Sequence, residues 1–464
     1  MFLNIDKQYP VAEAVVDNEG HRLSYGQLVK EVENFAPGLD ERSIIFCLCR
    51  NTAGSLVGYL GMVEKNTVPL MLSDKIENEL LVNLIVTYKP GYLWVPENIK
   101  SQFDYESVYN CLGYVLLKTE FIKYPIHPQL ELLMTTSGST GSPKLVRYKK
   151  GNLEANARNV AKAFGWTKAE RPVCDLGMQY TMGLNVINTH LYVGACVLLT
   201  TFNLLSGDFW EYIKKEQATN FTGVPFSYDI LAKLHFDKMD LPYLTTLSQG
   251  GGKLTEERFS WLADYARKTH RRFLASFGTT ETSARMCVLP AELAKEKTGS
   301  IGKAIPEGEL FLIDSEGKRI MEPIAEGELC YQGPNVTMGY AICREDLKKG
   351  DEWKGVYRTG DLARRDMDGC YYITGRLSRF LKLLSYRVSL DQCECLIREK
   401  FGIDCACSGS DRRMDIYITE TDKAKAVQEF VCRKTGLFRN LFRVVVIDEI
   451  PRNESGKILY KKLN

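Results

Sequence analysis

A chain of 464 residues is longer than one hydrophobic core normally serves, so we expect two or more domains. Its hydrophobic content of 45% and charged content of 25% are typical of soluble globular proteins. The formal net charge of +2 provides no general attraction to nucleic acid or to an anionic membrane surface, so we predict neither as a partner. The first residues lack a signal-peptide pattern, and Arg50 and Asn51 interrupt the best apolar stretch, residues 44–63. We therefore expect a cytoplasmic protein with no membrane span.

The first third of the chain alternates short apolar runs with helical patterns. Residues 43–49 and 68–72 are predicted as buried strands, and residues 52–64 between them have the apolar spacing of a helix. A strand, a helix and a second strand in this order are typical of a parallel sheet. The same pattern recurs at residues 173–200 and 220–276. These repeats predict a large α/β domain.

The character of the sequence changes twice after Gly302. Residues 309–314 and 327–331 read as short strands joined by turns, which predicts a β-rich subdomain of the large domain. Beyond residue 378, strand candidates at 414–418 and 443–447 precede a basic tail, which predicts a small α+β unit. We therefore divide the chain into an N-terminal domain, residues 1–377, and a C-terminal domain, residues 378–464.

A loop rich in glycine and hydroxyl groups directly follows the apolar run at residues 132–134. Residues 135–144 (TTSGSTGSPK) combine two glycines, several Ser and Thr side chains and a terminal lysine. Backbone N–H groups and hydroxyls gathered at the end of a strand suit a phosphate group. The spacing Gly-x-x-Gly-x-x-Lys differs from that of a P-loop NTPase, and Pro143 fixes the direction of the chain before Lys144.

Five further segments complete the pattern. Residues 249–254 (QGGGKL) form a glycine turn that lets a flat ring approach the backbone, and residues 277–281 (FGTTE) place an aromatic, a hydroxyl and a carboxylate on one turn. Residues 357–362 (YRTGDL) offer a carboxylate suited to a ribose diol, and residues 375–376 (GR) add a cation. Residues 453–457 (NESGK) place a lysine near the end of the chain.

The set resembles the adenylate-forming superfamily, which includes acyl-CoA synthetases, peptide-synthetase adenylation domains and luciferases. The resemblance extends from residues 23–28 (LSYGQL) to Lys457. It implies a large N-terminal domain of mixed sheets and helices, with a β-rich subdomain, and a small α+β C-terminal lid. It also implies that ATP, Mg²⁺ and a carboxylic acid react in the cleft between them. The acyl-adenylate formed with release of pyrophosphate then passes its acyl group to a thiol of CoA or of a phosphopantetheinyl carrier protein.

The resemblance also implies roles for individual residues. The loop residues that would bind the β- and γ-phosphates are Thr136, Ser137, Gly138, Ser139, Thr140, Gly141 and Lys144. The residues that would bind the rest of the nucleotide are Gly251, Gly252, Lys253, Phe277 and Gly278 around the adenine, and Asp361 with Arg376 at the ribose. Three residues would carry the chemistry: Thr280 touches the α-phosphate, Glu281 holds Mg²⁺, and Lys457 bridges the carboxylate and the α-phosphate. Ser378 would be the hinge of the lid.

The acid itself is less constrained by the sequence. Thr181 aligns with the aspartate that amino-acid-activating relatives pair with the substrate ammonium, and a buried ammonium without a carboxylate would be costly. We therefore favour an acyl or aryl acid. The side chains expected to form an apolar pocket wall, with ordinary core packing as the alternative, are Met182, Val224, Phe226 and Met286.

Two other functions stay open at this point. One is amino-acid adenylation followed by loading of a carrier. The other is a non-catalytic nucleotide-binding relative, which is suggested by departures from the family pattern at Leu145, Ser378 and Ser385. Retention of Glu281 and Lys457 argues against the non-catalytic alternative, because nucleotide binding alone requires neither.

Overall fold

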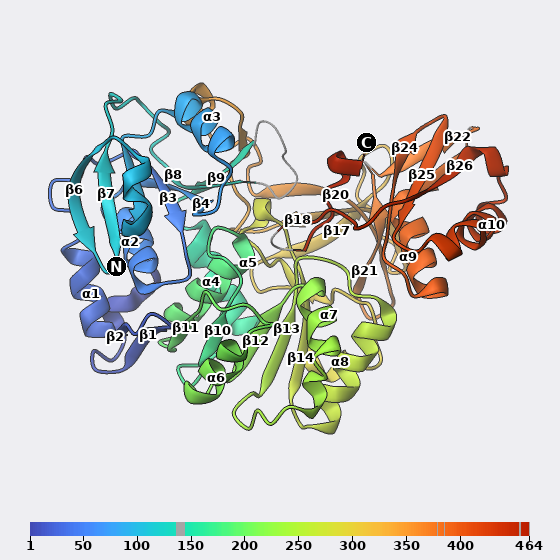
Figure 1. Cartoon of the computed structure of the whole chain (residues 1–464), viewed down its shortest axis with the longest axis horizontal. Helices are drawn as coiled ribbons and strands as arrows, with labels where there is room; N and C mark the ends of the chain where they lie inside the picture. The colour runs from blue at the N-terminus through green and yellow to red at the C-terminus, as the bar shows by residue number, and fades with distance from the viewer. Residues whose placement is uncertain (136–143, 378, 385, 454–455, 464) are drawn as a thin grey trace.

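The computed structural model describes residues 1–135, 144–377, 379–384, 386–453 and 456–463. Two large sheets and a smaller one form the N-terminal part, and a small α+β unit forms the C-terminal part (Figure 1). The predicted fold class is confirmed. In the described residues, no helix has both the length and the apolar character needed to cross a membrane.

The first large sheet has the strand order β19-β9-β8-β4-β3-β5-β7-β6. Its strands are β3 (Ile44–Cys49), β4 (Val68–Ser73), β5 (Tyr92–Pro96), β6 (Glu106–Cys111), β7 (Tyr114–Lys118), β8 (Leu130–Thr135), β9 (Leu145–Lys149) and β19 (Tyr340–Ala341). Strands β3 and β4 pair in parallel and are joined by helix α2 (Ala53–Glu64). The predicted β-α-β unit is therefore present, with its boundaries within one residue of those expected.

The second large sheet has the order β16-β15-β14-β13-β12-β10-β11-β1-β2. Its strands are β1 (Glu13–Asp17), β2 (Arg22–Ser24), β10 (Pro172–Cys174), β11 (Val197–Leu199), β12 (Asn220–Gly223), β13 (Thr246–Gln249), β14 (Arg272–Phe277), β15 (Cys287–Leu289) and β16 (Lys303–Ala304). Its central strands pair in parallel, as the recurring sequence pattern predicts.

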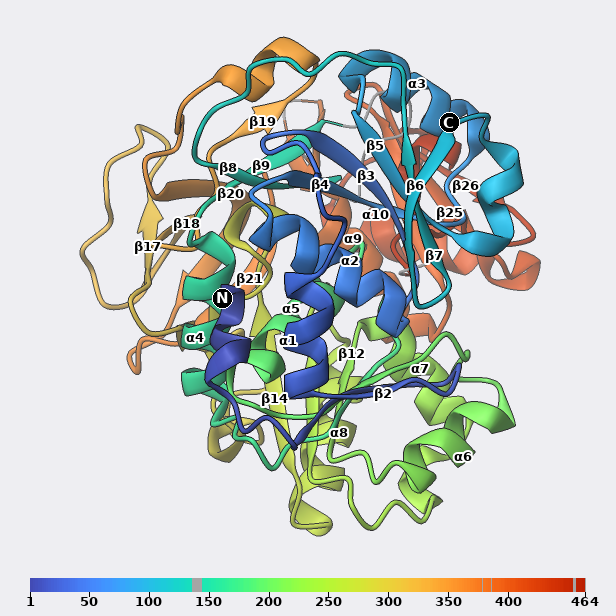
Figure 2. The ribbon, with the colours of Figure 1, turned by 90° about the vertical axis from the view of Figure 1, so that its left-hand side faces the viewer.

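Helices lie between the two sheets and on both outer faces (Figure 2). The helices between the sheets are α1 (Tyr25–Glu33), α2, α4 (Asn152–Phe164) and α5 (Thr181–Tyr192). The outer helices are α3 (Asn78–Tyr88) on the first sheet, and α6 (Gly207–Lys215), α7 (Pro225–Lys233) and α8 (Glu256–Lys268) on the second. This arrangement explains why the central strands are apolar without alternation, because both of their faces are covered.

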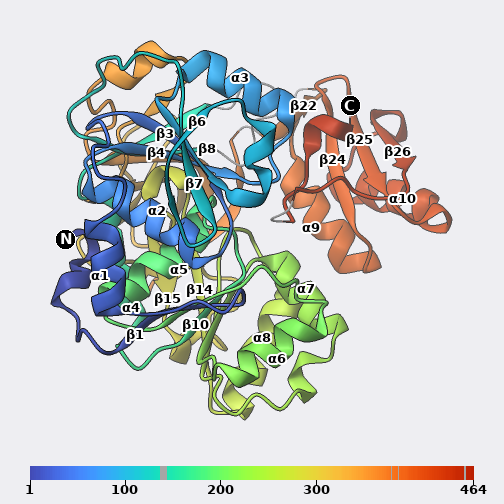
Figure 3. The same cartoon turned by 60° about the vertical axis from the view of Figure 1, so that its left-hand side comes forward.

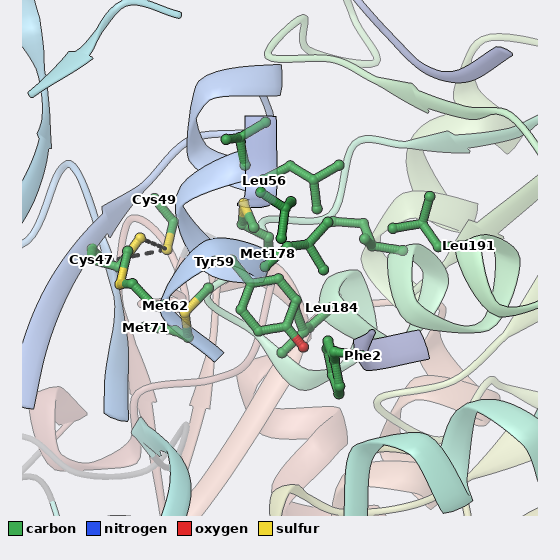
Figure 4. Close-up of a cluster of buried hydrophobic side chains, with 14 of the residues drawn as sticks. Phe2, Cys47, Cys49, Leu56, Tyr59, Met62, Met71, Met178, Leu184 and Leu191 are labelled. Atoms are coloured by element: carbon green, nitrogen blue, oxygen red, sulfur yellow. Dashed lines mark hydrogen bonds between the residues drawn. The ribbon is translucent and has the colours of Figure 1, made fainter. Parts of the chain in front are cut away.

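Strand β3 illustrates how one strand serves two cores. Cys47 and Cys49 point into the cluster formed with α2 and α5, where Met62 and Met71 lie beside Cys47 (Figure 4). Phe46, between the two cysteines, points to the opposite face and packs in the cluster that contains α3. Successive side chains of a strand leave opposite faces, so a single apolar run joins both layers.

The β-rich subdomain is an antiparallel sheet of four strands, β17-β18-β20-β21. Its strands are β17 (Glu309–Ile313), β18 (Ala325–Gln332), β20 (Val356–Arg365) and β21 (Tyr371–Arg376). It extends the large domain toward the C-terminal unit (Figure 1).

The C-terminal unit stands at one side of the molecule (Figure 3). Its elements are β22 (Phe380–Leu383), β23 (Tyr386–Ser389), α9 (Leu390–Phe401), β24 (Cys405–Ser410), β25 (Arg413–Ile418), α10 (Ala424–Thr435) and β26 (Phe442–Val446). Leu383, Ile397, Ile416 and Val427 belong to a separate hydrophobic cluster within this unit. The division of the chain at residue 378 stays a prediction, and Ser378 lies outside the described residues.

Candidate active site

The predicted phosphate loop is anchored at both ends by strand pairing. Strand β8 ends at Thr135, Lys144 directly precedes β9, and Thr135 pairs with Leu145 in the antiparallel ladder. The loop residues predicted to bind phosphates between these ends, Thr136, Ser137, Gly138, Ser139, Thr140 and Gly141, lie outside the described residues. Lys144 is the described member of this set.

Tyr340 connects Lys144 to Glu281. The Nζ of Lys144 lies 3.7 Å from the centroid of the Tyr340 ring. The Tyr340 hydroxyl donates a hydrogen bond of 2.6 Å to Oε1 of Glu281. Burial and the charge of Glu281 raise the pKa of Tyr340, so it remains a donor at neutral pH. Sequence analysis missed Tyr340 because its strand, β19, has only two residues and carries no recognisable motif.

The turn that carries Thr280 and Glu281 is held by residues from other elements. At Gly278, a Cβ would lie 1.5 Å from the carbonyl oxygen of Ala284, so no other residue fits there. The Tyr148 hydroxyl donates to the Thr280 carbonyl at 2.6 Å. The backbone N–H of Thr337 donates to the Glu281 carbonyl at 3.0 Å. These contacts leave the Glu281 side chain directed toward Tyr340.

The predicted adenine segment is a closed turn at the end of β13. The side-chain amide of Gln249 donates to the carbonyls of Gly250 at 3.2 Å and Gly252 at 2.5 Å. Gly251 adopts φ +77°, a conformation that favours glycine. Lys253 donates to the carbonyl of Ile373 on β21 at 3.1 Å, so the turn is tied to the β-rich subdomain.

Asp361 and Arg376 form an ion pair across strands β20 and β21. They are paired in the ladder, and Nε of Arg376 lies 2.7 Å from Oδ1 of Asp361. Asp361 is 2% exposed, and its Oδ2 has no hydrogen-bond partner in the described part of the chain. Burial raises the pKa of Asp361 although Arg376 opposes the shift. The unused oxygen provides an acceptor for a hydroxyl, as the predicted ribose contact requires.

Lys457 reaches this region from the C-terminal unit. Its backbone N–H donates to Oδ1 of Asn453 at 2.9 Å. The Lys457 side chain retains solvent exposure, yet desolvation by the surrounding protein and repulsion by Arg376 lower its pKa, while Glu281 raises it. Lys457 therefore lies within electrostatic reach of Glu281 and Arg376, two residues of the N-terminal part.

The turn before Lys457 touches the N-terminal domain. Gly456 adopts φ +74°, and a Cβ there would lie 2.4 Å from Cβ of Phe226. Two hydrogen bonds from Arg452 to Asp404, at 2.8 and 2.7 Å, hold the same segment to the C-terminal unit. The segment thus bridges the two parts of the molecule.

The structure separates the four residues predicted as an apolar pocket wall. Met182 and Val224 lie against the glycine turn, next to Gly250 and Gly251 respectively. Phe226 is instead 44% exposed and contacts Gly456. Met286 is fully buried in the core of the β-rich subdomain. That these four side chains form one apolar pocket wall stays a prediction.

Thr181 lines a small cavity whose wall contains both polar and apolar side chains. The cavity has about 10 Å³ accessible to water and is bordered by Tyr148, Asn156, Asn185, Asn188 and Ser283 among others. The amide of Asn185 donates to Oδ1 of Asn156 at 2.7 Å, and Oδ1 of Asn185 has no partner among the described residues. Amide groups in this position were not expected from the sequence, because helix α5 reads as predominantly apolar.

Comparison with known proteins agrees with this geometry. The family model described as "AMP-binding enzyme" matches residues 3–341. Oxalate–CoA ligase of Arabidopsis thaliana is 28% identical over 360 residues, which cover 73% of this chain and 68% of the relative. Peroxisomal OPC-8:0-CoA ligase 1 of the same plant is 27% identical over 350 residues, with 71% of this chain and 63% of the relative covered. The chain thus spans slightly less than two thirds of this second relative.

A solved structure shows the same fold along nearly the whole chain. O-succinylbenzoate coenzyme A synthetase from Bacillus subtilis, in complex with ATP and magnesium ion, superposes with a TM-score of 0.79 at 19% identity. The superposition covers 99% of this chain and 98% of that one. Because the family model extends over most of the sequence, the resemblance noted from the motifs is confirmed, and this chain belongs to the AMP-binding enzyme family.

Proposed function

We propose that this protein is an AMP-forming acid–thiol ligase. It activates a carboxylic acid with ATP to an acyl-adenylate, releases pyrophosphate, and transfers the acyl group to the thiol of CoA. The observation that carries the proposal is that Gly456, directly before Lys457, packs against Phe226 of the N-terminal part, while the charges of Glu281 and Arg376 act on the pKa of Lys457. The CoA ligases among the relatives, and the neighbour in complex with ATP and magnesium ion, support the same reaction.

In the first step an oxygen of the substrate carboxylate attacks the α-phosphorus of ATP. A new P–O bond forms, the bond to pyrophosphate breaks, and pyrophosphate leaves. Two anions must be brought together, so fixed cations at the reacting atoms are the main requirement. We assign this role to Lys457 at the carboxylate and α-phosphate, with Thr280 at the α-phosphate and Lys144 at the end of the phosphate loop.

The remaining predicted residues fit the nucleotide and its metal. The free oxygen of Asp361 suits the ribose hydroxyls, and the closed turn at Gly251 and Gly252 suits the adenine. The carboxylate of Glu281 uses Oε1 to accept from Tyr340, which leaves Oε2 as an oxygen ligand for Mg²⁺. When bound, Mg²⁺ would offset the negative charge of the phosphates.

In the second step the thiol sulfur attacks the acyl carbon and AMP leaves. The acceptor proposed first is CoA, and a phosphopantetheinyl carrier protein is the alternative acceptor. Amino-acid adenylation with carrier loading remains the second candidate, although Thr181 offers no carboxylate to a substrate ammonium. We also propose a cytoplasmic location, and a lid formed by residues 378–464 that changes pose between the two steps.

ATP–pyrophosphate exchange tests the first step directly. The purified full chain is screened with fatty, aryl, dicarboxylic and amino acids in the presence of Mg²⁺. Exchange that depends on one class of acid supports the proposal, and subsequent thioester formation with CoA or with a carrier protein identifies the acceptor. Nucleotide binding without exchange for any acid would instead favour a non-catalytic relative.

A further inference from the structure

Arg285 is a buried cation that forms no ion pair with any carboxylate in the described part of the chain. The residue is 0% exposed and lies between η4 (Thr280–Thr282) and β15. Its Nη2 contacts the hydroxyls of Ser248 at 3.2 Å and Thr222 at 3.4 Å. Its Nε and Nη1 have no hydrogen-bond partner, and no ion pair involves Arg285, within the described ranges. The guanidinium carbon lies 4.5 Å from the centroid of the Phe164 ring.

A buried cation destabilises the folded protein unless a counter-charge or hydrogen-bond acceptors surround it. Burying a cation without a counter-charge costs much more than burying a neutral polar group. Burial lowers the pKa of Arg285 to about 10, which still leaves it charged at neutral pH. The charges of Arg285 and Asp175 act in opposite directions on the pKa of Tyr228, but the two residues form no ion pair with each other. The unused Nη1 of Arg285 is therefore suited to an anion that arrives with a ligand.

The sheet places Arg285 under the glycine turn of the site. Thr222 and Ser248 are paired in the parallel ladder, so their side chains leave the same face. Leu247, between Ser248 and Thr246, packs on the opposite face against α8. Gly250 follows Ser248 by two residues on the Arg285 face, roughly 6.6 Å further along the chain at about 3.3 Å per residue. Arg285 thus contacts β13 two residues before the turn predicted to frame the adenine.

The side chain of Met182 covers the glycine turn. A Cβ at Gly250 would be 2.2 Å from Cε of Met182, so the thioether covers the glycine. Methionine side chains are unbranched and adapt readily to an incoming group. The cavity beside Thr181 also approaches Arg285, because the side chain of Asn156 lines it and donates to the Arg285 carbonyl at 2.8 Å.

We propose that Arg285 determines substrate specificity by pairing with a second carboxylate of the acid. The substrate is then a short dicarboxylic acid: one carboxylate reacts near Lys457 and Thr280, and the other displaces Met182 and accepts a hydrogen bond from Nη1 of Arg285. This inference rests on the proposed function, because it names the class of acid that the same site activates. It narrows the acyl or aryl acid favoured by the sequence to a short dicarboxylic acid.

The test compares acids that differ only in the second carboxylate. ATP–pyrophosphate exchange is measured for the full chain with succinate against butyrate, glutarate against pentanoate, and adipate against hexanoate. A charge-assisted pair predicts a kcat/KM about 10- to 100-fold higher for the best dicarboxylate than for its partner. Arg285→Gln should remove most of that preference by lowering the dicarboxylate value, with little change for the monocarboxylate.

Arg272→Gln is the matched control. Arg272 lies at the start of β14 and its guanidinium carbon is 5.8 Å from the Trp166 ring centroid, at the opposite end of that strand from the glycine turn. Arg272 donates to the carbonyl of Phe164, whose ring Arg285 contacts, so its replacement removes a second cation beside Phe164 and should leave the ratio unchanged. Arg285→Met, which keeps the length of the side chain, serves if the glutamine variant does not fold.

Several results would overturn the inference. The wild type could prefer monocarboxylates, or Arg285→Gln could lower both members of each pair equally, as expected of a purely structural cation. Thermal stabilisation by each dicarboxylate provides a readout independent of catalysis. If no acid supports exchange, the proposed function fails, yet stabilisation by a dicarboxylate that requires Arg285 would still support the binding site. Absence of that stabilisation together with absence of exchange would reject both.

Discussion

The Tyr340 hydroxyl donates to Oε1 of Glu281 at 2.6 Å, while the face of the same ring lies 3.7 Å from Nζ of Lys144. One side chain therefore orients a carboxylate predicted to hold Mg²⁺ and a lysine predicted to bind phosphate. Tyr340 also pairs through its backbone with Val146 of β9, the strand that follows the phosphate loop. A shift of β9 at the end of the phosphate loop would therefore reach Glu281 through Tyr340.

Tyr340→Phe should slow adenylation about 10- to 100-fold, because a hydrogen bond to a charged group contributes about 1.5–3 kcal/mol. The KM for ATP should change little, since the ring beneath Lys144 remains. Tyr340→Leu removes the ring as well, and a cation–π contact of about 0.5–1 kcal/mol is lost, so the KM for ATP should also rise. Steady-state pyrophosphate exchange at varied ATP and Mg²⁺ separates the two effects. Wild-type kinetics for Tyr340→Phe would mean that the hydroxyl does not position Glu281.

Lys457→Ala should lower acyl-adenylate formation by about 100-fold or more, because its charge acts on the transition state. The KM for ATP should stay nearly constant. Lys462→Ala, which removes an exposed lysine from the same tail, is the control and should retain activity. A Lys457→Ala variant that keeps most of its exchange rate would remove this residue from the proposed mechanism.

Glu131→Gln should stabilise the protein at alkaline pH. Burial, together with the nearby charge of Glu154, raises the pKa of Glu131 to about 8, and its Oε2 lacks a hydrogen-bond partner among the described residues. The folded state therefore holds this proton to higher pH than the unfolded state, so wild-type stability falls as pH rises from about 4.5 to 8. The variant should flatten this dependence and gain on the order of 1–3 kcal/mol above pH 8.

Denaturant unfolding at several pH values measures this effect. Glu106→Gln, at an exposed position of β6, is the control and should leave the pH dependence unchanged. An equal pH slope in Glu131→Gln and the wild type would show that Glu131 is ionised in the folded protein.

Ser378→Pro tests the proposed movement of the lid. A cleft that first excludes water around an acyl-adenylate and then admits a thiol requires two arrangements, and a hinge concentrates the backbone change in few residues. Proline fixes φ near −65°, so the variant should keep part of the exchange activity and lose most thioester formation. Ser378→Ala should keep both activities. Equal loss of both half-reactions in a folded Ser378→Pro variant would place the hinge elsewhere.

The sequence by itself determined the features that depend on local order along the chain. Apolar periodicity predicted the β-α-β unit of β3, α2 and β4, because strand and helix patterns repeat over neighbouring residues. The motifs with Glu281, Asp361 and Lys457 were recognisable because each is a short turn or loop with chemically distinctive residues.

Only the tertiary structure decided which distant side chains meet. Tyr340 reaches Glu281 across 59 positions of sequence through a two-residue strand that has no motif of its own. Arg285 and Met286 are neighbours in sequence. Arg285 contacts the hydroxyl of Ser248 on β13, whereas Met286 packs in the core of the β-rich subdomain. The local sequence pattern indicates that a side chain is buried, but the packing of the layers decides which groups it faces. That packing therefore also decides whether a buried charge belongs to the core or to the substrate site.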